Sequence, residues 1–225
     1  MVDGSLARRA VAEFVGTALL VATVVGSGIA ADRLSDDGGV TLLINTWATV
    51  GALFVLILTL GAVSGAHFNP VVTLAARVEG SIESRAIPIY VGAQVAGALS
   101  GAVLANVMFD VAATATSSTD RSDPRLRLAE IVATAGLVLV IFGLSRAGRG
   151  RAVPACVAGY IGAAYFFTSS TSFANPAVTV GRSITDSYSG IRPGDVSLFI
   201  VMQVLGASIG YGLARYLYPT TMEAT

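Results

Sequence analysis

The sequence predicts an all-α membrane protein with six transmembrane helices and two re-entrant half-helices, arranged as an inverted repeat. Of its 225 residues, 54% are hydrophobic and 12% are charged, whereas a soluble domain has about 25% charged residues. Residues 66–72 and residues 172–178 follow nearly the same pattern, since each contains Asn-Pro followed by two apolar residues. Each half of the chain also contains three long apolar segments. An odd number of crossings gives the second half the opposite topology in the membrane.

Each Asn-Pro pair is expected to begin a short helix. Asn is a favourable N-cap, and Pro at the first helical position gives up only an N–H that has no partner within the helix. About ten apolar residues follow each start, and ten helical residues cover about 15 Å, half of the roughly 30 Å hydrocarbon layer. Two half-helices are therefore predicted to meet at their N-termini in the membrane centre. The pore-centre residues are Asn69, Pro70, Val71, Asn175, Pro176 and Ala177.

The remaining elements follow from runs of apolar residues and their polar interruptions. The expected spans are residues 10–31, 41–63, 86–108, 128–144, 152–167 and 196–217, with an acidic loop at 32–39 and an arginine-rich loop at 145–151. We interpret residues 1–225 as a single transmembrane domain. Repeat one covers about residues 8–109, a polar connector covers 110–127, and repeat two covers about 128–217.

Charge placement predicts the orientation of the chain. Most arginines fall at one end of the predicted bundle, including Arg8, Arg9 and the three in the loop at 145–151, while the acidic loop falls at the other. By the positive-inside rule the arginine-rich end is cytoplasmic. We therefore expect a multi-pass protein of the cell membrane with both termini in the cytoplasm.

Composition excludes several classes of function. Cys156 is the single cysteine and His67 the single histidine, so neither a disulfide framework nor a Cys- or His-rich metal site is expected. The chain has no lysine and a formal net charge of zero, which does not favour a nucleic-acid partner. With so few reactive groups we expect no cofactor, no bound metal and no enzymatic activity.

The paired motifs resemble those of the major intrinsic proteins, the aquaporins and aquaglyceroporins. The resemblance covers essentially the whole chain: the two Asn-Pro motifs, Ser64-Gly65-Ala66-His67 before the first, Glu13 with Glu130, and Gln94 with Gln203. It implies an aquaporin-like hourglass fold, a right-handed bundle with one pore per protomer, and usually a homotetramer in the lipid bilayer. The expected partners are water and small neutral solutes. Two helix N-termini aimed at one point would repel cations, while the two Asn amides could donate hydrogen bonds to a passing solute.

The resemblance also places a selectivity filter. Water channels of this family commonly carry an arginine three positions after the second motif's Asn, where this chain has Val178. Spacing from the family pattern predicts the other filter positions as Thr49, Ala163 and Ser172, with Gly162 or Ala164 if the register slips. A change of one residue in the register of this span could also turn Tyr160 or Tyr165 toward the pore. A ring of these small residues would be wide and would lack a fixed cation.

Other polar residues have two interpretations each. Glu13 and Glu130 could carry protons, but their symmetric placement favours a role as hydrogen-bond acceptors for the re-entrant loops, and Gln94 and Gln203 are interpreted in the same way. His67 is either a gate at the cytoplasmic entrance or a loop-packing residue. Arg182, one turn beyond Val178, either restores a charge to the outer vestibule or is an ordinary interfacial arginine. Close helix packing is expected at Gly92, Gly97, Gly101, Gly206 and Gly210.

These features predict a passive channel for small uncharged solutes such as glycerol, other polyols and neutral metalloid hydroxides like arsenous acid, with water passing as well. The replacement of the filter arginine by a smaller residue resembles a bacterial aquaporin subgroup associated with arsenic. A water-selective aquaporin is the main alternative. A proton-coupled secondary transporter that uses Glu13 and Glu130 is a third.

Overall fold

The computed structural model describes residues 5–219, and every regular element within that range is a helix. Two short 3₁₀ turns, η1 (Ser84–Ala86) and η2 (Gly150–Ala152), precede α4 and α6. The helices are α1 (Leu6–Leu34), α2 (Gly38–Ser64), α3 (Pro70–Val78), α4 (Ile87–Met108), α5 (Pro124–Arg146), α6 (Val153–Phe167), α7 (Pro176–Arg182) and α8 (Pro193–Leu217).

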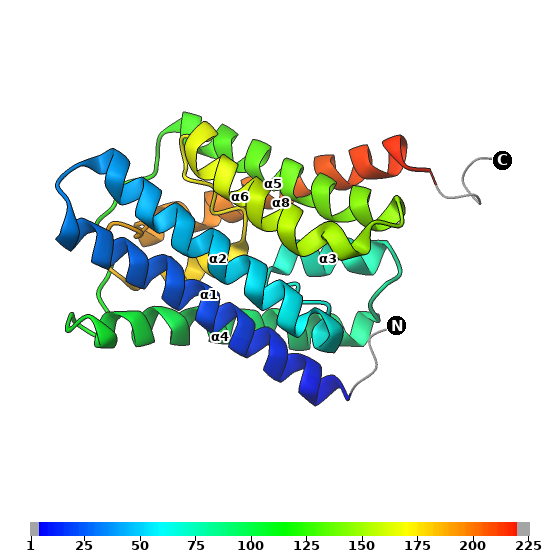
Figure 1. Cartoon of the computed structure of the whole chain (residues 1–225), viewed down its shortest axis with the longest axis horizontal. Helices are drawn as coiled ribbons and strands as arrows, with labels where there is room; N and C mark the ends of the chain where they lie inside the picture. Colours follow the sequence, from blue (N-terminus) through cyan, green and yellow to red (C-terminus); the bar gives the residue numbers. More distant parts are fainter. Residues whose placement is uncertain (1–4, 220–225) are drawn as a thin grey trace.

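The longer helices lie along the bundle (Figure 1): α1, α2, α4, α5, α6 and α8. Five of them, α1, α2, α4 with η1, α5 and α8, are long and apolar enough to cross a membrane. The sixth, α6, has only 15 residues. These residues cover about 22 Å and the preceding 3₁₀ turn adds about 6 Å, so together they nearly match the roughly 30 Å hydrocarbon layer. The six predicted crossings are therefore present.

The two short helices are the half-helices. In Figure 1, α3 occupies the right-hand half of the bundle and α7, drawn in gold, the left-hand half. The beginning of α1 and the end of α8 lie at the same end of the bundle, on the right. At nine and seven residues, α3 and α7 are shorter than the ten predicted. The chain leaves α7 at Ser183, and the Arg182 side chain turns back to donate to the Ser189 carbonyl oxygen.

Some helix boundaries differ from prediction because capping residues extend the helices. The first helix begins at Leu6 rather than residue 10, since the Ser5 hydroxyl caps it. The fifth begins at Pro124, inside the predicted connector, because the Asp123 side chain accepts a hydrogen bond from the Arg125 N–H (2.8 Å). In both α5 and α8 a proline occupies the first turn, where its missing N–H costs nothing.

Glycines set the contact between the long helices of each repeat. A Cβ at Gly97 or Gly101 of α4 would lie 2.4 Å or 2.2 Å from a backbone carbonyl oxygen of α1. The same is true of Gly206 and Gly210 of α8, where a Cβ would lie 2.5 Å or 2.1 Å from a carbonyl oxygen of α5. Both pairs have Gly-x-x-x-Gly spacing, which lets two helix backbones approach closely in a membrane. The prediction for Gly92 is wrong, because that residue is exposed and a Cβ there would meet nothing within 4 Å.

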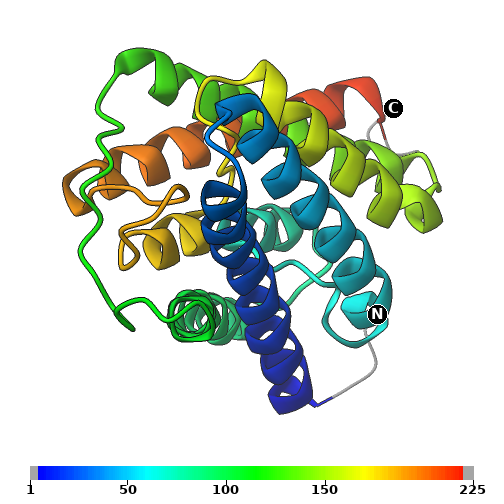
Figure 2. The same cartoon turned by 60° about the vertical axis from the view of Figure 1, so that its left-hand side comes forward.

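The segment between α4 and α5 runs along one end of the bundle and packs against the loop that follows α7 (Figure 2). The Ala115 and Ser117 N–H groups donate to the carbonyl oxygens of Ile184 and Ser183, at 3.0 Å and 3.2 Å. The backbone N–H and hydroxyl of Ser118 both donate to Asp186. These two hydrogen bonds lower the pKa of the Asp186 carboxyl. The connector is thus fixed beside the second half-helix.

Candidate functional site: a central cavity between two half-helices

The loops before the two half-helices have the same unusual backbone. Ala66 and Phe68 in the first loop have φ values of 50° and 49°, and Ser172 and Ala174 in the second have 51° and 47°. Residues other than glycine rarely adopt this left-handed region, and each instance costs of order 1–3 kcal/mol. Strong local hydrogen bonds must therefore hold both loops in place.

Glu13 of α1 provides these bonds in the first repeat. Its carboxylate accepts from the backbone N–H groups of His67 (3.0 Å) and Phe68 (2.7 Å). It also accepts from the Ser64 hydroxyl (2.6 Å) and from Nε2 of Gln94 (2.7 Å). Glu13 and Gln94 are fully buried, so these donors have no access to water.

Glu130 of α5 does the same in the second repeat. Its carboxylate accepts from the Phe173 and Ala174 N–H groups, both at 2.9 Å. The Ser170 hydroxyl and Nε2 of Gln203 each donate to it at 2.6 Å. Each oxygen of the two carboxylates therefore accepts from two donors. This geometry matches the acceptor role inferred from the symmetric placement of Glu13 and Glu130.

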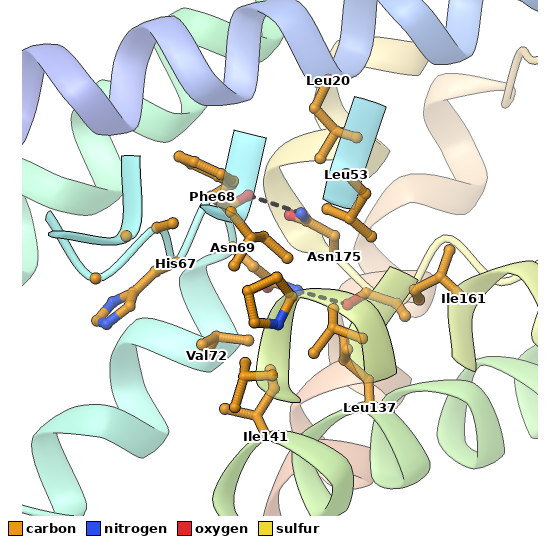
Figure 3. Close-up of a pocket in the computed structure, with 18 of the residues that line it drawn as sticks. Leu20, Leu53, His67, Phe68, Asn69, Val72, Leu137, Ile141, Ile161 and Asn175 are labelled. Atoms are coloured by element: carbon orange, nitrogen blue, oxygen red, sulfur yellow. Dashed lines mark hydrogen bonds between the residues drawn. The ribbon is translucent and has the colours of Figure 1, made fainter. Parts of the chain in front are cut away.

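The two motifs interlock at the centre of the molecule. The Oδ1 atoms of Asn69 and Asn175 cap their own helices by accepting from Val71 and Ala177 N–H groups at 3.1 Å and 3.0 Å. The Nδ2 atoms cross over: Asn69 donates to the Ala174 carbonyl oxygen (2.8 Å) and Asn175 to the Phe68 carbonyl oxygen (2.7 Å), as Figure 3 shows. Each amide uses one of its two hydrogens in this way and keeps the other for a ligand.

A cavity of about 650 Å³ passes these amides. Its wall is mainly apolar, and Figure 3 shows aliphatic side chains from α1, α2, α3, α5 and α6 around the two asparagines. The labelled aliphatic residues are Leu20, Leu53, Val72, Leu137, Ile141 and Ile161. Near one end the cavity is lined by Gly65, His67 and Arg151, and towards the other by Thr49, Tyr165, Ser172, Val178 and Arg182. The cavity thus offers two fixed donors within a surface that binds polar molecules weakly.

Three of the four predicted filter residues line the cavity together: Thr49, Ser172 and Val178. The placement of Ala163 is wrong, because the structure puts it on the exposed outer face of α6. Tyr165, two residues later, faces inward instead, and its hydroxyl oxygen lies 3.2 Å from that of Thr49. The Thr49 hydroxyl donates to the Asn45 carbonyl oxygen, so Tyr165 must be the donor between the two hydroxyls. The lining at this level therefore contains an aromatic side chain, where the prediction had only small residues.

A guanidinium group also faces this part of the cavity. Arg182 is only 3% exposed and lies over the Phe173 ring, with 3.4 Å between its Cζ and the ring centroid. Arg121, from the connector, contacts the same ring at 4.7 Å. Arg121 donates through Nε to the Gly190 carbonyl oxygen (2.8 Å) and through Nη1 to the Ser170 carbonyl oxygen (3.3 Å). Burial lowers the pKa of Arg121, and the nearby Glu130 carboxylate opposes that shift.

Comparison with known proteins identifies the family. The family model described as Major intrinsic protein matches residues 2–173. The chain belongs to the major intrinsic protein family. It is 50% identical over 217 residues to "Aquaglyceroporin AqpS" of Rhizobium meliloti, covering 96% of this chain and 93% of that protein. It is 30% identical to "Putative aquaporin NIP4-1" of Arabidopsis thaliana, over 98% of this chain and 79% of the relative.

A solved structure supports the fold independently. The aquaglyceroporin from Plasmodium falciparum superposes with a TM-score of 0.73 over 97% of each chain, at 19% sequence identity. Members of the major intrinsic protein family are passive membrane channels and not enzymes. This major intrinsic protein is accordingly a multi-pass membrane channel, as the paired motifs predicted.

His67 lies beside the first half-helix in this family member and lines the cavity. Its Nδ1 is 3.1 Å from the Thr73 hydroxyl, and its ring lies 5.3 Å from the Tyr90 ring. These contacts confirm that the residue packs in the loop, and it also borders the cavity. A role as a gate stays a prediction. No group of three or more His, Cys, Asp or Glu residues suited to a metal ion occurs within residues 5–219.

Sequence reasoning offered Tyr165 only as an alternative to Ala163 and did not name Arg121. The rotation of α6 depends on its packing against α2, so spacing from the motif alone missed Tyr165 by two residues. Arg121 belongs to an irregular connector whose path follows from contacts with the loop after α7. For Tyr165 the available signal was its aromatic ring in a span of mostly small residues.

Proposed function

We propose that this protein is a passive channel for small uncharged solutes. Glycerol, other polyols and neutral metalloid hydroxides such as arsenous acid fit this description, and water accompanies them. The single observation that carries the proposal is the pair of crossed Asn amides, each with one free hydrogen, inside a largely apolar cavity. A solute with several hydroxyl groups can accept from these amides in turn, while the wall holds it only weakly.

Two features support selection against small cations. The half-helices α3 and α7 point their N-termini at the cavity centre, and each N-terminus carries a partial positive charge. The Arg182 guanidinium adds a full charge within the same cavity. A sodium ion or a hydronium ion would meet both, whereas a neutral polyol would not.

The ring of Thr49, Tyr165, Ser172 and Val178 is proposed as the selectivity filter. An uncharged valine three positions after Asn175 leaves space that a longer side chain would fill, which favours solutes larger than water. The relative named Aquaglyceroporin AqpS shares half of its aligned residues with this chain, which supports a solute of the same general class.

A water-selective channel is the second candidate. The contact between the Thr49 and Tyr165 hydroxyls favours it, because this contact places an aromatic side chain in the ring. A proton-coupled transporter is less well supported. Glu13 and Glu130 are absent from the cavity lining, and each already accepts four hydrogen bonds from fixed donors.

The membrane context is also part of the proposal. We infer a location in the cell membrane with both termini in the cytoplasm and assembly as a homotetramer. Large apolar side chains on the outside of the bundle support contact with lipid or with neighbouring protomers. Examples are Trp47 at 69%, Leu58 at 60% and Phe166 at 53% exposure.

Stopped-flow light scattering on proteoliposomes tests the function. Water, glycerol and a larger polyol are compared for the wild type, Val178→Arg and the control Val178→Leu, which adds bulk without charge. We expect wild-type glycerol flux, a loss of about tenfold or more in Val178→Arg, and a smaller loss in Val178→Leu. Wild-type flux of water alone would overturn the solute proposal in favour of the water channel. Equal glycerol flux in all three would remove Val178 from the filter.

A further inference from the structure

The guanidinium of Arg182 is fixed in position, but only one of its three nitrogens donates a hydrogen bond within the described residues. Its Nε donates to the Ser189 carbonyl oxygen, and its plane is fixed over the Phe173 ring. Neither Nη1 nor Nη2 has a hydrogen-bond partner among residues 5–219, and no described carboxylate forms an ion pair with this side chain. Since Arg182 lines the cavity, these terminal nitrogens are available to a molecule inside it.

A second unused donor lies in the same part of the cavity. The Ser172 hydroxyl is buried and has no hydrogen-bond partner, although the residue as a whole lines the cavity and is only 4% exposed. A buried hydroxyl without a partner is costly, so this group is expected to bond to a water or a ligand in the cavity. Ser172 directly precedes Phe173, the residue on which Arg182 is stacked, and both Ser172 and Arg182 line the same cavity.

The carboxylate closest to this region cannot neutralise Arg182 by direct contact. Both oxygens of Glu130 are occupied by the donors of the second loop, as described above. Arg121 brings a second guanidinium to the same aromatic ring. The hydroxyl hydrogens of Thr49 and Tyr165 are used by Asn45 and Thr49, so Arg182 and Ser172 are the donors left for a ligand.

We propose that this end of the cavity binds a small monovalent oxyanion, with Nη1 and Nη2 of Arg182 and the Ser172 hydroxyl as its donors. A carboxylate or sulfonate has two oxygens at the spacing that a guanidinium fork recognises. The site lies in the pore of the proposed function and, when occupied, obstructs solute passage.

Methanesulfonate is a suitable probe because it stays ionised throughout the usable pH range and cannot cross as a neutral acid. Isothermal titration of the purified full-length protein in detergent, against sodium chloride at equal ionic strength, measures binding directly. The variants are Arg182→Gln, Arg182→Lys and Ser172→Ala, and Arg125→Gln serves as a matched control on an exposed arginine. Alanine is tolerated at this backbone conformation, since Ala66 adopts φ 50° at the equivalent position of the first loop.

We expect saturable binding to the wild type and to Arg125→Gln. Affinity for methanesulfonate should fall about tenfold or more in Arg182→Gln and several-fold in Ser172→Ala. The loss in Arg182→Lys should be smaller than in Arg182→Gln and larger than in Ser172→Ala, because lysine keeps the charge but lacks the paired guanidinium donors. No saturable binding to the wild type would overturn the proposal. Equal affinity in wild type, Arg182→Gln and Ser172→Ala would also overturn it, since binding would then be elsewhere on the surface.

A parallel flux assay separates this proposal from the channel function. Glycerol flux in proteoliposomes should fall as methanesulfonate is raised, and Ser172→Ala should need several-fold more of the anion for the same inhibition. Binding in detergent together with no glycerol flux would retain the anion site and reject the proposed function. Glycerol flux together with no binding would reject the anion site and retain the proposed function.

Discussion

At the scale of single residues, the symmetric carboxylates Glu13 and Glu130 show how a buried charge can serve structure. Each is fully buried and accepts two backbone N–H bonds from its loop. The backbone is left-handed at two non-glycine residues in the first loop and at three in the second, where Thr171 also has a positive φ. Lipid offers no alternative partner for those N–H groups. The carboxylates therefore offset the strain of the loops that present the Asn amides.

Replacing Glu130 by Gln should destabilise the protein. A glutamine keeps one acceptor oxygen, but its NH₂ group would face the donors that bond to the second carboxylate oxygen in the wild type. About two charge-assisted hydrogen bonds would be lost, which lowers the free energy of unfolding by roughly 3 kcal/mol. We expect a lower midpoint of thermal unfolding in detergent for Glu130→Gln and Glu13→Gln alike. The control Asp36→Asn removes an exposed charge and should leave the midpoint unchanged. Normal stability combined with loss of a pH-dependent flux that the wild type shows would instead favour proton coupling.

The residues that sequence could predict are those fixed by local chemistry. Asn69 and Asn175 cap helices that begin one residue later, so their roles depend on short-range geometry. Glu13 and Glu130 were identifiable because a carboxylate inside an apolar span demands a partner. Ala163 was misplaced because the rotation of α6 is decided by distant packing. The connector residue Arg121 could not be predicted, because an irregular segment carries no periodicity.

At the scale of elements, the two Gly-x-x-x-Gly contacts determine how closely the long helices of each repeat approach. The pairs α1 with α4 and α5 with α8 use the same device at equivalent places. Gly92 lies outside both contacts, and sequence alone could not separate it from Gly97, since both are glycines of one helix. The side that a helix turns to its neighbour is set by the whole bundle.

Adding one methyl group at these contacts should separate the helices. In Gly101→Ala and Gly210→Ala the new Cβ would lie 2.2 Å and 2.1 Å from a carbonyl oxygen of the neighbouring helix. Overpacking of this kind costs typically 1–3 kcal/mol, so the midpoint of thermal unfolding should fall in both variants. Gly92→Ala is the matched control in the same helix as Gly101 and should be neutral or slightly stabilising. An unchanged midpoint in Gly101→Ala would show that the backbones do not approach this closely.

At the scale of the whole molecule, the bundle has an arginine-rich end and an aspartate-rich end. The arginine-rich end includes Arg146, which forms an ion pair with Glu79 (2.9 Å), and the arginines of the loop between α5 and α6. The opposite end includes Asp36 and Asp37 between α1 and α2 and the connector between α4 and α5. This division is what the positive-inside rule uses to set topology.

Cysteine labelling should reveal the orientation. In a Cys156→Ser background, Asp36→Cys and Arg149→Cys introduce single thiols at exposed loop positions on opposite ends of the bundle. A membrane-impermeant maleimide applied to intact cells should label Asp36→Cys and should label Arg149→Cys only after the membrane is opened. The reverse pattern would place both termini outside the cell.

The crossed amide bonds link positions 105 and 107 residues apart in the chain. During synthesis the first re-entrant loop can therefore form these two hydrogen bonds only after the second repeat has entered the membrane. The conducting path thus forms in one late step of biogenesis. A chain arrested after its first half has no continuous pore, so solutes cannot leak through it.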